Sequence, residues 1–235
     1  MGKKKLQKNR NVVIVLSRYP EPGFTKTRLY PLLSPEESAR LSRSFIQDTD
    51  LALGRLSHVD KLWCYYPATG QAKRFFEKSL RFCDGLFPQE GENFSQRLFN
   101  SLNLGFERGY KRVAHMGTDS PDVPLVWISS LFKKLDDRDI VIGPALDGGY
   151  YLLGVRDIYW TLFDQMPVGT DLVLDHILKR AAESGLSIDL LGFYQDIDRA
   201  RDFFDFAHRM WNVYNPYTFP LIQLWHKKKR FSLAS

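Results

Sequence analysis

Two aspartates follow a short, mostly apolar run near the middle of the chain. The stretch GTDSPD at positions 117–122 comes directly after residues 113–116, which predict a buried strand. Open α/β sheets bind their ligands beyond the carboxyl ends of the strands. Carboxylates there suit a hard cation such as Mg²⁺, which takes one or two protein carboxylates and completes its shell with phosphate oxygens and water. Asp119 and Asp122 are therefore candidate metal ligands in a site for a phosphorylated nucleotide.

A loop with three cations follows the first predicted strand, residues 12–16. It reads SRYPEPGFTKTRL at positions 17–29. Lysine and arginine in such a loop can hold a diphosphate as a point charge and as a bidentate fork, and a glycine lets backbone amides approach the ligand. The alternative is a surface turn whose cations are solvated. The candidate nucleotide-binding residues are Ser17, Arg18, Gly23, Lys26, Arg28 and Thr118.

Three common site patterns are absent from the sequence. The residues before Lys26 do not form the G-x-x-x-x-G-K-[ST] pattern of a P-loop, and no G-x-G-x-x-G fingerprint occurs. His115 lies inside a predicted strand, without a cluster of other histidines. These absences argue against a P-loop enzyme, a nicotinamide or flavin Rossmann enzyme, and a catalytic triad or zinc site.

Three further aspartates lie where predicted strands end or helices begin. Asp147, in the stretch Asp147-Gly148-Gly149-Tyr150, comes where a ligand could lie against the backbone, and its carboxylate could accept hydrogen bonds from a sugar or base; a hairpin turn is the alternative. Asp198 could be a further metal ligand or only the N-cap of a helix that starts at Arg199. Asp171 could likewise cap a helix or act as a general base toward an acceptor hydroxyl.

The charge of the chain is concentrated at its ends. The 235 residues carry a formal net charge of +6, and 44% of them are hydrophobic, which is enough for one large domain. Residues 1–10 and 226–235 contain five and four of the basic residues and no acid, so residues 11–225 hold 24 basic against 27 acidic residues. We therefore expect a basic tail at 1–10, one domain over 11–211, an extension with a basic end at 212–235, and no specific binding of nucleic acid.

The cysteines and the apolar runs bear on the cellular compartment. Cys64 and Cys83 form neither a disulfide framework nor a metal-ligand spacing. The longest N-terminal apolar run, 12–16, is too short for a signal peptide, and no apolar stretch approaches the length of a transmembrane segment. A cytoplasmic protein is the expectation. The sequence leaves the oligomeric state open.

Short apolar runs alternate with helical patterns along the chain. Continuous apolar strands imply a sheet covered on both faces, and the βαβα order predicts an α/β fold with a mostly parallel central sheet. The first helix starts with Ser34, Pro35 and Glu37, a capping-box pattern. The predicted strands are 12–16, 62–66, 113–117, 140–142, 150–155 and 188–193; the predicted helices are 35–56, 71–80, 94–110, 125–135, 170–184 and 199–211.

Four ordered motifs make the chain resemble a known family. They are RYPEPG at 18–23 with KTRL at 26–29, GTDSPD at 117–122, GPA at 143–145 with DGGYY at 147–151, and DID at 196–198. Over residues 12–203 the chain resembles the GT-A-like transferases labelled as glycosyltransferases of arsenosugar biosynthesis. That family looks like a relative of nucleotide-diphospho-sugar transferases and of small nucleotidylyltransferases, so the resemblance implies a GT-A (nucleotide-diphospho-sugar transferase) Rossmann-like fold.

The resemblance also implies roles for individual residues. Lys26 and Arg28 fall on phosphate-binding positions, Asp119 on the metal position, and residues 147–149 on the donor or acceptor pocket. The family usually continues its last aspartate as Asp-Thr-Pro-Glu-Asp, whereas Asp198 is followed here by Arg-Ala-Arg-Asp. The chain thus keeps Asp198 and the last aspartate of that pattern but not the turn between them.

Three functions are compatible with these residues. The leading hypothesis is a metal-dependent glycosyltransferase that uses Mg²⁺ or Mn²⁺, a nucleotide-diphospho-sugar donor and a small-molecule acceptor, with Asp171 or Asp147 orienting or deprotonating the acceptor. The alternative is a nucleotidylyltransferase that joins an NTP to a phosphorylated acceptor and releases pyrophosphate. The third is a non-catalytic nucleotide-binding protein.

Overall fold

A seven-stranded sheet forms the centre of the protein, as seen in a computed structural model that describes residues 10–209 and 215–224. The strands are β1 (Asn11–Arg18), β2 (Asp60–Tyr66), β3 (Gly85–Pro88), β4 (Arg112–Met116), β5 (Ile140–Pro144), β6 (Tyr150–Val155) and β7 (Ile188–Leu190). The α-helices are α1 (Pro35–Leu53), α2 (Gly70–Ser79), α3 (Phe94–Glu107), α4 (Leu125–Lys134), α5 (Val173–Glu183) and α6 (Ala200–Arg209). Two short 3₁₀ helices, η1 (Thr27–Leu29) and η2 (Trp160–Leu162), complete these elements.

The sheet is mixed but mostly parallel, in the order β3-β2-β1-β4-β6-β5-β7. β6 is antiparallel to both of its neighbours, β4 and β5, while the other pairings are parallel. The predicted α/β class with a mostly parallel sheet is confirmed. Because β6 runs in reverse, its first residue lies at the edge where the parallel strands end.

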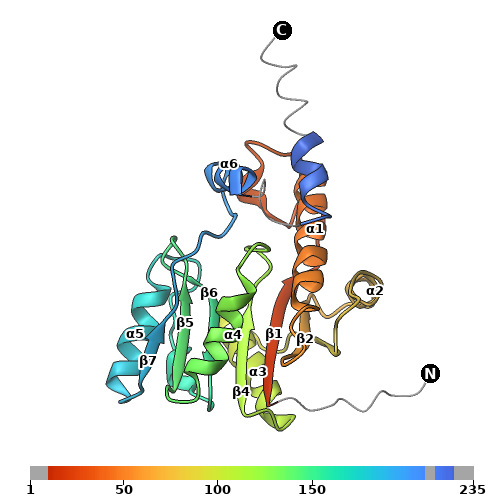
Figure 1. Ribbon diagram of the computed structural model, residues 1–235. Helices are drawn as coiled ribbons and strands as arrows, with labels where there is room; N and C mark the ends of the chain where they lie inside the picture. The colour runs from red at the N-terminus through yellow and green to blue at the C-terminus, as the bar shows by residue number, and fades with distance from the viewer. Residues whose placement is uncertain (1–9, 210–214, 225–235) are drawn as a thin grey trace, which may run out of the picture.

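Side chains of the strands alternate between two hydrophobic cores. On β1, Val13 and Val15 pack with residues of α1, α2 and α4, whereas Val12, Ile14 and Leu16 pack with residues of α3 and α5. Figure 1 shows the helices on the two sides of the sheet. The predicted coverage of both faces is thus confirmed, and it leaves only the edges of the sheet for a site.

The first long helix begins as its sequence predicts. Ser34 Oγ accepts a hydrogen bond from the backbone N–H of Glu37 at 3.2 Å, and Glu37 Oε2 accepts one from the N–H of Ser34 at 3.0 Å. This capping box satisfies two N–H groups that no helical carbonyl can reach. The helix ends at Leu53, three residues before the predicted end.

A third hydrophobic core lies beyond the carboxyl edge of the sheet. It joins Leu29 of η1 and Phe45 of α1 to Phe206 of α6 and to Ile222 of the segment 215–224. Figure 1 shows α6 and this segment beside the upper part of α1. This described part of the predicted extension therefore packs onto the rest of the fold. The predicted boundary at 211–212 and both basic tails, apart from Arg10, lie outside the described residues. Within the described ranges no helix is long and apolar enough to cross a membrane.

Candidate functional site

A cavity of about 1260 Å³ opens at the carboxyl edge of the sheet. It is lined by the ends of β1 and β4, by the turn that leads into β6, by the start of α5 and by the segment between β7 and α6. We call this cavity the pocket. The parallel strands and the reversed β6 thus bring segments from most of the chain to one place.

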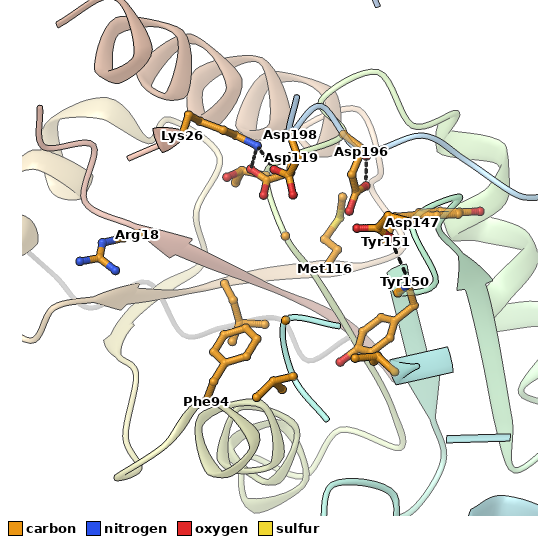
Figure 2. Close-up of a pocket in the computed structure, with 18 of the residues that line it drawn as sticks. Arg18, Lys26, Phe94, Met116, Asp119, Asp147, Tyr150, Tyr151, Asp196 and Asp198 are labelled. Carbon is orange, nitrogen blue, oxygen red and sulfur yellow. Dashed lines mark hydrogen bonds and ion pairs between the residues drawn. The ribbon is translucent and has the colours of Figure 1, made fainter. Parts of the chain in front are cut away.

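Lys26 lies at the centre of an ionic cluster in the pocket. Its Nζ is 2.7 Å from Asp119 Oδ1 and 2.9 Å from Asp198 Oδ1, and it donates to the carbonyl oxygen of Ile197 at 2.7 Å. These contacts use all three N–H donors of the ammonium group, and its side chain is only 6% exposed. Figure 2 shows Lys26 pointing at both carboxylates. The cluster ties the loop after β1 to the turn after β4 and to the segment before α6.

The charges of this cluster shift one another's pKa values. Burial would lower the pKa of Lys26, but the attraction of Asp119 and Asp198 outweighs burial and raises it. Burial raises the pKa of Asp119 despite the neighbouring ammonium. At Asp198 burial acts in the same direction, yet Lys26 and Arg28 more than offset it, and the pKa is lowered. The ion pairs thus hold Lys26 and Asp198 charged.

The donor set of the cluster fits a divalent cation. Asp119 and Asp198 both lie within 3 Å of one ammonium nitrogen, so their carboxylates are close together, and their side chains are 46% and 30% exposed. Among the described residues no group of three or more His, Cys, Asp or Glu side chains is placed to hold a metal ion. Two carboxylates suffice for Mg²⁺ when substrate oxygens and water complete the shell.

The structure separates the other predicted ligand, Asp122, from this pair. Asp122 does not line the pocket, its side chain is buried, and its carbonyl oxygen accepts a hydrogen bond from the hydroxyl of Tyr194 at 2.8 Å. The chain turns after Ser120, whose carbonyl accepts from the N–H of Val123 at 3.3 Å. That turn directs residues 119 and 122 to different surroundings.

Asp196 lines the pocket although the sequence analysis did not select it. Its carboxylate accepts a hydrogen bond from the hydroxyl of Ser120, and burial, with a contribution from Asp119, raises the pKa of Asp196 to about 7. The signal was present in the sequence. Asp196 and Asp198 flank Ile197, which is fully buried, and alternate residues of an extended segment point the same way.

The stretch predicted to form an acceptor or sugar pocket, residues 147–150, lies where β5 turns into β6. The turn is closed by hydrogen bonds between Ala145 and Gly149 and from the N–H of Gly149 to Asp147 Oδ1, both of 3.0 Å. Gly148 has a φ of +85°, and a Cβ atom there would lie 2.1 Å from the carbonyl oxygen of Asp171. The hairpin interpretation is therefore confirmed, and Asp147 and Asp171 line the same cavity. The role of this turn as an acceptor or sugar pocket stays a prediction.

Tyr150 also lines the pocket, from the first position of β6. Its hydroxyl lies 3.0 Å from Nε2 of His115, a fully buried residue of β4. Burial lowers the pKa of His115 to about 3, so this histidine is neutral. A neutral imidazole nitrogen that faces a hydroxyl holds the ring of Tyr150 at one orientation.

The predicted nucleotide-binding residues are distributed unevenly. The pocket is lined by Ser17, Arg18, Arg28 and Thr118, whereas the exposed Gly23 lies outside the lining. Arg28 Nη1 lies 3.5 Å from Asp198 Oδ2. The sequence analysis missed Tyr66, Gln89, Phe94 and Arg97, which also line the pocket. No short motif marks these four residues, because they come from the ends of two strands and the start of a helix.

Two known proteins are similar to the chain over most of its length. A solved protein described as a candidate nucleotide-diphospho-sugar transferase from Desulfovibrio desulfuricans G20 is 29% identical, with a TM-score of 0.86 over 92% of this chain and 95% of that one. The 2-phospho-L-lactate guanylyltransferase of Methanothermobacter thermautotrophicus is 28% identical over 194 residues, 79% of this chain and 78% of the relative. Neither carries the arsenosugar label that the motifs suggest.

More distant structures share the fold alone. A 4-diphosphocytidyl-2C-methyl-D-erythritol synthase from Anaerococcus prevotii has a TM-score of 0.55 at 8% identity, over 86% of this chain and 97% of that one. A CMP:2-keto-3-deoxy-manno-octonic acid synthetase in complex with CTP has a TM-score of 0.51 at 11% identity, over 86% of this chain and 98% of that one. The fold is that of the superfamily of nucleotide-diphospho-sugar transferases and nucleotidylyltransferases. A family model matches residues 50–170, just over half of the chain, and the protein belongs to that family, described as "Uncharacterized protein conserved in bacteria (DUF2064)".

Proposed function

We propose that the protein is a metal-dependent glycosyltransferase with a nucleotide-diphospho-sugar donor. The observation that carries the proposal is the convergence of Asp119, Asp198 and Lys26 in one pocket at the carboxyl edge of the sheet. The similarity to the Desulfovibrio protein supports it over nearly the full length of both chains.

The central demand of glycosyl transfer is stabilisation of the departing nucleoside diphosphate. Asp119 and Asp198 would hold a Mg²⁺ or Mn²⁺ ion, and a bound metal supplies positive charge where the leaving group gains negative charge. Lys26 uses its three donors on protein oxygens, so in this state it positions the two carboxylates. Arg28 has a side chain that is 55% exposed at the pocket, and it is the cation of this cluster best placed to reach phosphate oxygens.

The pocket has an acidic wall beside the ionic cluster. Asp147, Asp171 and Asp196 line it. A phosphorylated acceptor would face like charges there, whereas a neutral hydroxyl can donate a hydrogen bond to a carboxylate. The acidic wall therefore favours a hydroxyl acceptor, which Asp147 or Asp171 would orient or deprotonate as a general base.

Nucleotidyl transfer is the second candidate. The 28% identity to a guanylyltransferase favours it, and two carboxylates with a nearby lysine and arginine serve an attack at phosphorus as well as at an anomeric carbon. A non-catalytic nucleotide-binding protein is the third reading, and retention of a complete ionic cluster disfavours it.

A ligand panel separates these functions. The full-length protein is scanned for thermal shifts with NTPs and NDP-sugars in the presence of Mg²⁺ or Mn²⁺, and stabilising NDP-sugars are then followed for release of NDP in the presence of sugar and polyol acceptors. Stabilisation by NDP-sugars with NDP release supports glycosyl transfer, whereas stabilisation by NTPs alone supports nucleotidyl transfer. If no nucleotide stabilises the protein, the proposal is wrong.

Two variants locate the metal in this assay. Asp119→Asn removes a charged ligand from the cluster, so the metal-dependent part of the thermal shift should disappear. Asp122→Asn is a matched control in the same turn and outside the pocket, so it should retain that part, measured against its own melting temperature. Loss of the metal effect in Asp122→Asn alone would contradict the assignment of Asp119.

A further inference from the structure

Five side chains form an end of the pocket that the ionic cluster does not occupy. They are Arg18 at the end of β1, Tyr66 at the end of β2, Gln89 just after β3, and Phe94 and Arg97 in the first turn of α3. We call this the arginine end. Figure 2 shows Arg18 and Phe94 well apart from Lys26 and the aspartates around it. A ligand that spans the pocket would therefore place a different chemical group at each end.

The arginine end presents flat surfaces to the pocket. The guanidinium of Arg97 lies over the ring of Tyr66, 4.7 Å from its centroid, and 5.7 Å from the centroid of Phe94. The guanidinium of Arg18 lies 5.5 Å from the centroid of Tyr66. Phe94 is 44% exposed, so part of its ring is open to a ligand. Aromatic rings and arginine planes of this kind stack on nucleobases.

The hydrogen-bonding groups of this end are nearly all donors. Arg97 Nη1 donates to the carbonyl of Gly91 at 3.4 Å, while its Nε is buried without a hydrogen-bond partner among the described residues. The amide nitrogen of Gln89 donates to the carbonyl oxygens of Cys64 at 2.9 Å and Ser17 at 3.4 Å. That nitrogen is thereby committed, and the oxygen of the Gln89 amide is the part left for a ligand, as an acceptor.

We propose that the arginine end selects a guanine base, an inference that rests on the proposed nucleotide donor. Guanine offers adjacent acceptors, O6 and N7, to the fork of Arg97, the pairing that arginine makes with guanine in nucleic acids. Its N1–H and N2 amino donors suit an acceptor such as Gln89 Oε1. Adenine carries an amino group beside N7 and would set a donor against the guanidinium.

The commitment of Gln89 also excludes the usual glutamine–adenine pairing, which needs both the oxygen and the nitrogen of the amide. Cytosine presents two acceptors and an amino donor, but its single ring covers less of an exposed aromatic face such as that of Phe94. The donor is thus inferred to be a GDP-sugar, or GTP under the second candidate function.

Calorimetric titration of the full-length protein in Mn²⁺ with GDP, IDP, ADP, CDP and UDP tests this base preference. GDP should bind at least about tenfold more tightly than ADP, CDP or UDP, since one bidentate pair discriminates by roughly that factor. IDP keeps O6, N7 and N1–H and should stay within about tenfold of GDP. Equal or tighter binding of ADP, CDP or UDP overturns the inference and leaves the proposed function standing. If none of the five nucleotides binds, the proposed function is overturned and the inference with it.

Paired variants then assign the preference to named side chains. Arg97→Lys keeps the charge but loses the planar fork, so the GDP-to-ADP ratio should fall to within about threefold. Arg108→Lys is the matched control: Arg108 ends the same helix and stacks on Phe87 at 4.1 Å, but it lies outside the pocket lining, so the ratio should not change. Gln89→Met should lower GDP affinity more than ADP affinity. A ratio unaffected by both Arg97→Lys and Gln89→Met overturns the assignment.

Discussion

Replacing Lys26 by methionine should destabilise the protein and make its stability depend on a divalent cation. Methionine has nearly the length of lysine but no ammonium group, so the variant retains the packing of the chain and removes the three contacts to Asp119, Asp198 and Ile197. Two carboxylates then face each other without a cation between them. A metal ion placed there would restore the missing charge.

The size of the effect follows from the exposure of the partners. Removing one member of a fully buried ion pair costs about 3–5 kcal/mol. Here the Asp119 and Asp198 side chains are 46% and 30% exposed, so water recovers part of their solvation. We therefore expect a loss of about 2–3 kcal/mol, or roughly 5–10 °C in melting temperature for a chain of this size.

Thermal unfolding with and without Mg²⁺ measures both parts of the prediction, and Mg²⁺ should raise the melting temperature of Lys26→Met more than that of the wild type. Lys134→Met is the control, because Lys134 makes one ion pair of 2.7 Å with Asp189 and both side chains are about one-third exposed. Such a pair is worth about 0–1 kcal/mol. If Lys26→Met melts within about 1 °C of the wild type, a shift of less than 0.5 kcal/mol, the cluster does not hold the three segments together.

Three further predictions concern the surroundings of the site. Gly148→Ala should lower the free energy of unfolding in urea by more than Gly185→Ala. Both glycines have a positive φ, so an alanine at either position is strained by about 1–2 kcal/mol. Only at Gly148 would the added Cβ atom also lie against a carbonyl oxygen. Asp48→Ala removes the acceptor of two backbone N–H groups in the segment 215–224, so amide hydrogen exchange should rise in that segment first; unchanged exchange there would contradict the contact. Hydrogen bonds from Ser187 hold the pKa of Asp139 below its usual value. The contribution of Asp139 to the free energy of unfolding is therefore fully present above its pKa in the unfolded chain and is lost as the pH falls through its pKa in the folded protein. The stability difference between the wild type and Asp139→Asn should accordingly shrink on acidification from pH 7 to below about 4; a constant difference across that range would refute it.

The parts of the fold with strong local signals could be predicted from the sequence. The helix at Pro35–Leu53 was predicted to start where it does, because its capping box is local. The strand Gly85–Pro88 was missed, since its four residues begin with glycine and end with proline and belong to the edge of the sheet. The reversal of β6 was anticipated only by the hairpin alternative at Asp147-Gly148, because an apolar run has the same pattern in either direction.

The site shows the same division between local and long-range signals. Lys26, Asp119 and Asp198 could be selected because each follows or precedes a recognisable element, and the structure brings them together. Asp122 was placed wrongly beside Asp119, because sequence spacing does not reveal how a turn orients two side chains. Gln89 contacts Ser17 and Cys64, and Arg97 contacts Tyr66, all far away in the sequence, so no local pattern could indicate these contacts.

The reversal of β6 has a consequence for how the substrate range of such a protein could change. Because β6 is reversed, it ends at the edge of the sheet opposite the pocket, and the chain returns to the carboxyl edge before α5. Residues 166 and 168–171, at the end of this return, line the pocket. Val168 there is 39% exposed, whereas Gly169 has a φ of +81°, at which an added side chain is strained although nothing lies within 4 Å of it. A new side chain at position 168 would therefore change the wall of the pocket without disturbing the packed sheet or the ionic cluster around Lys26.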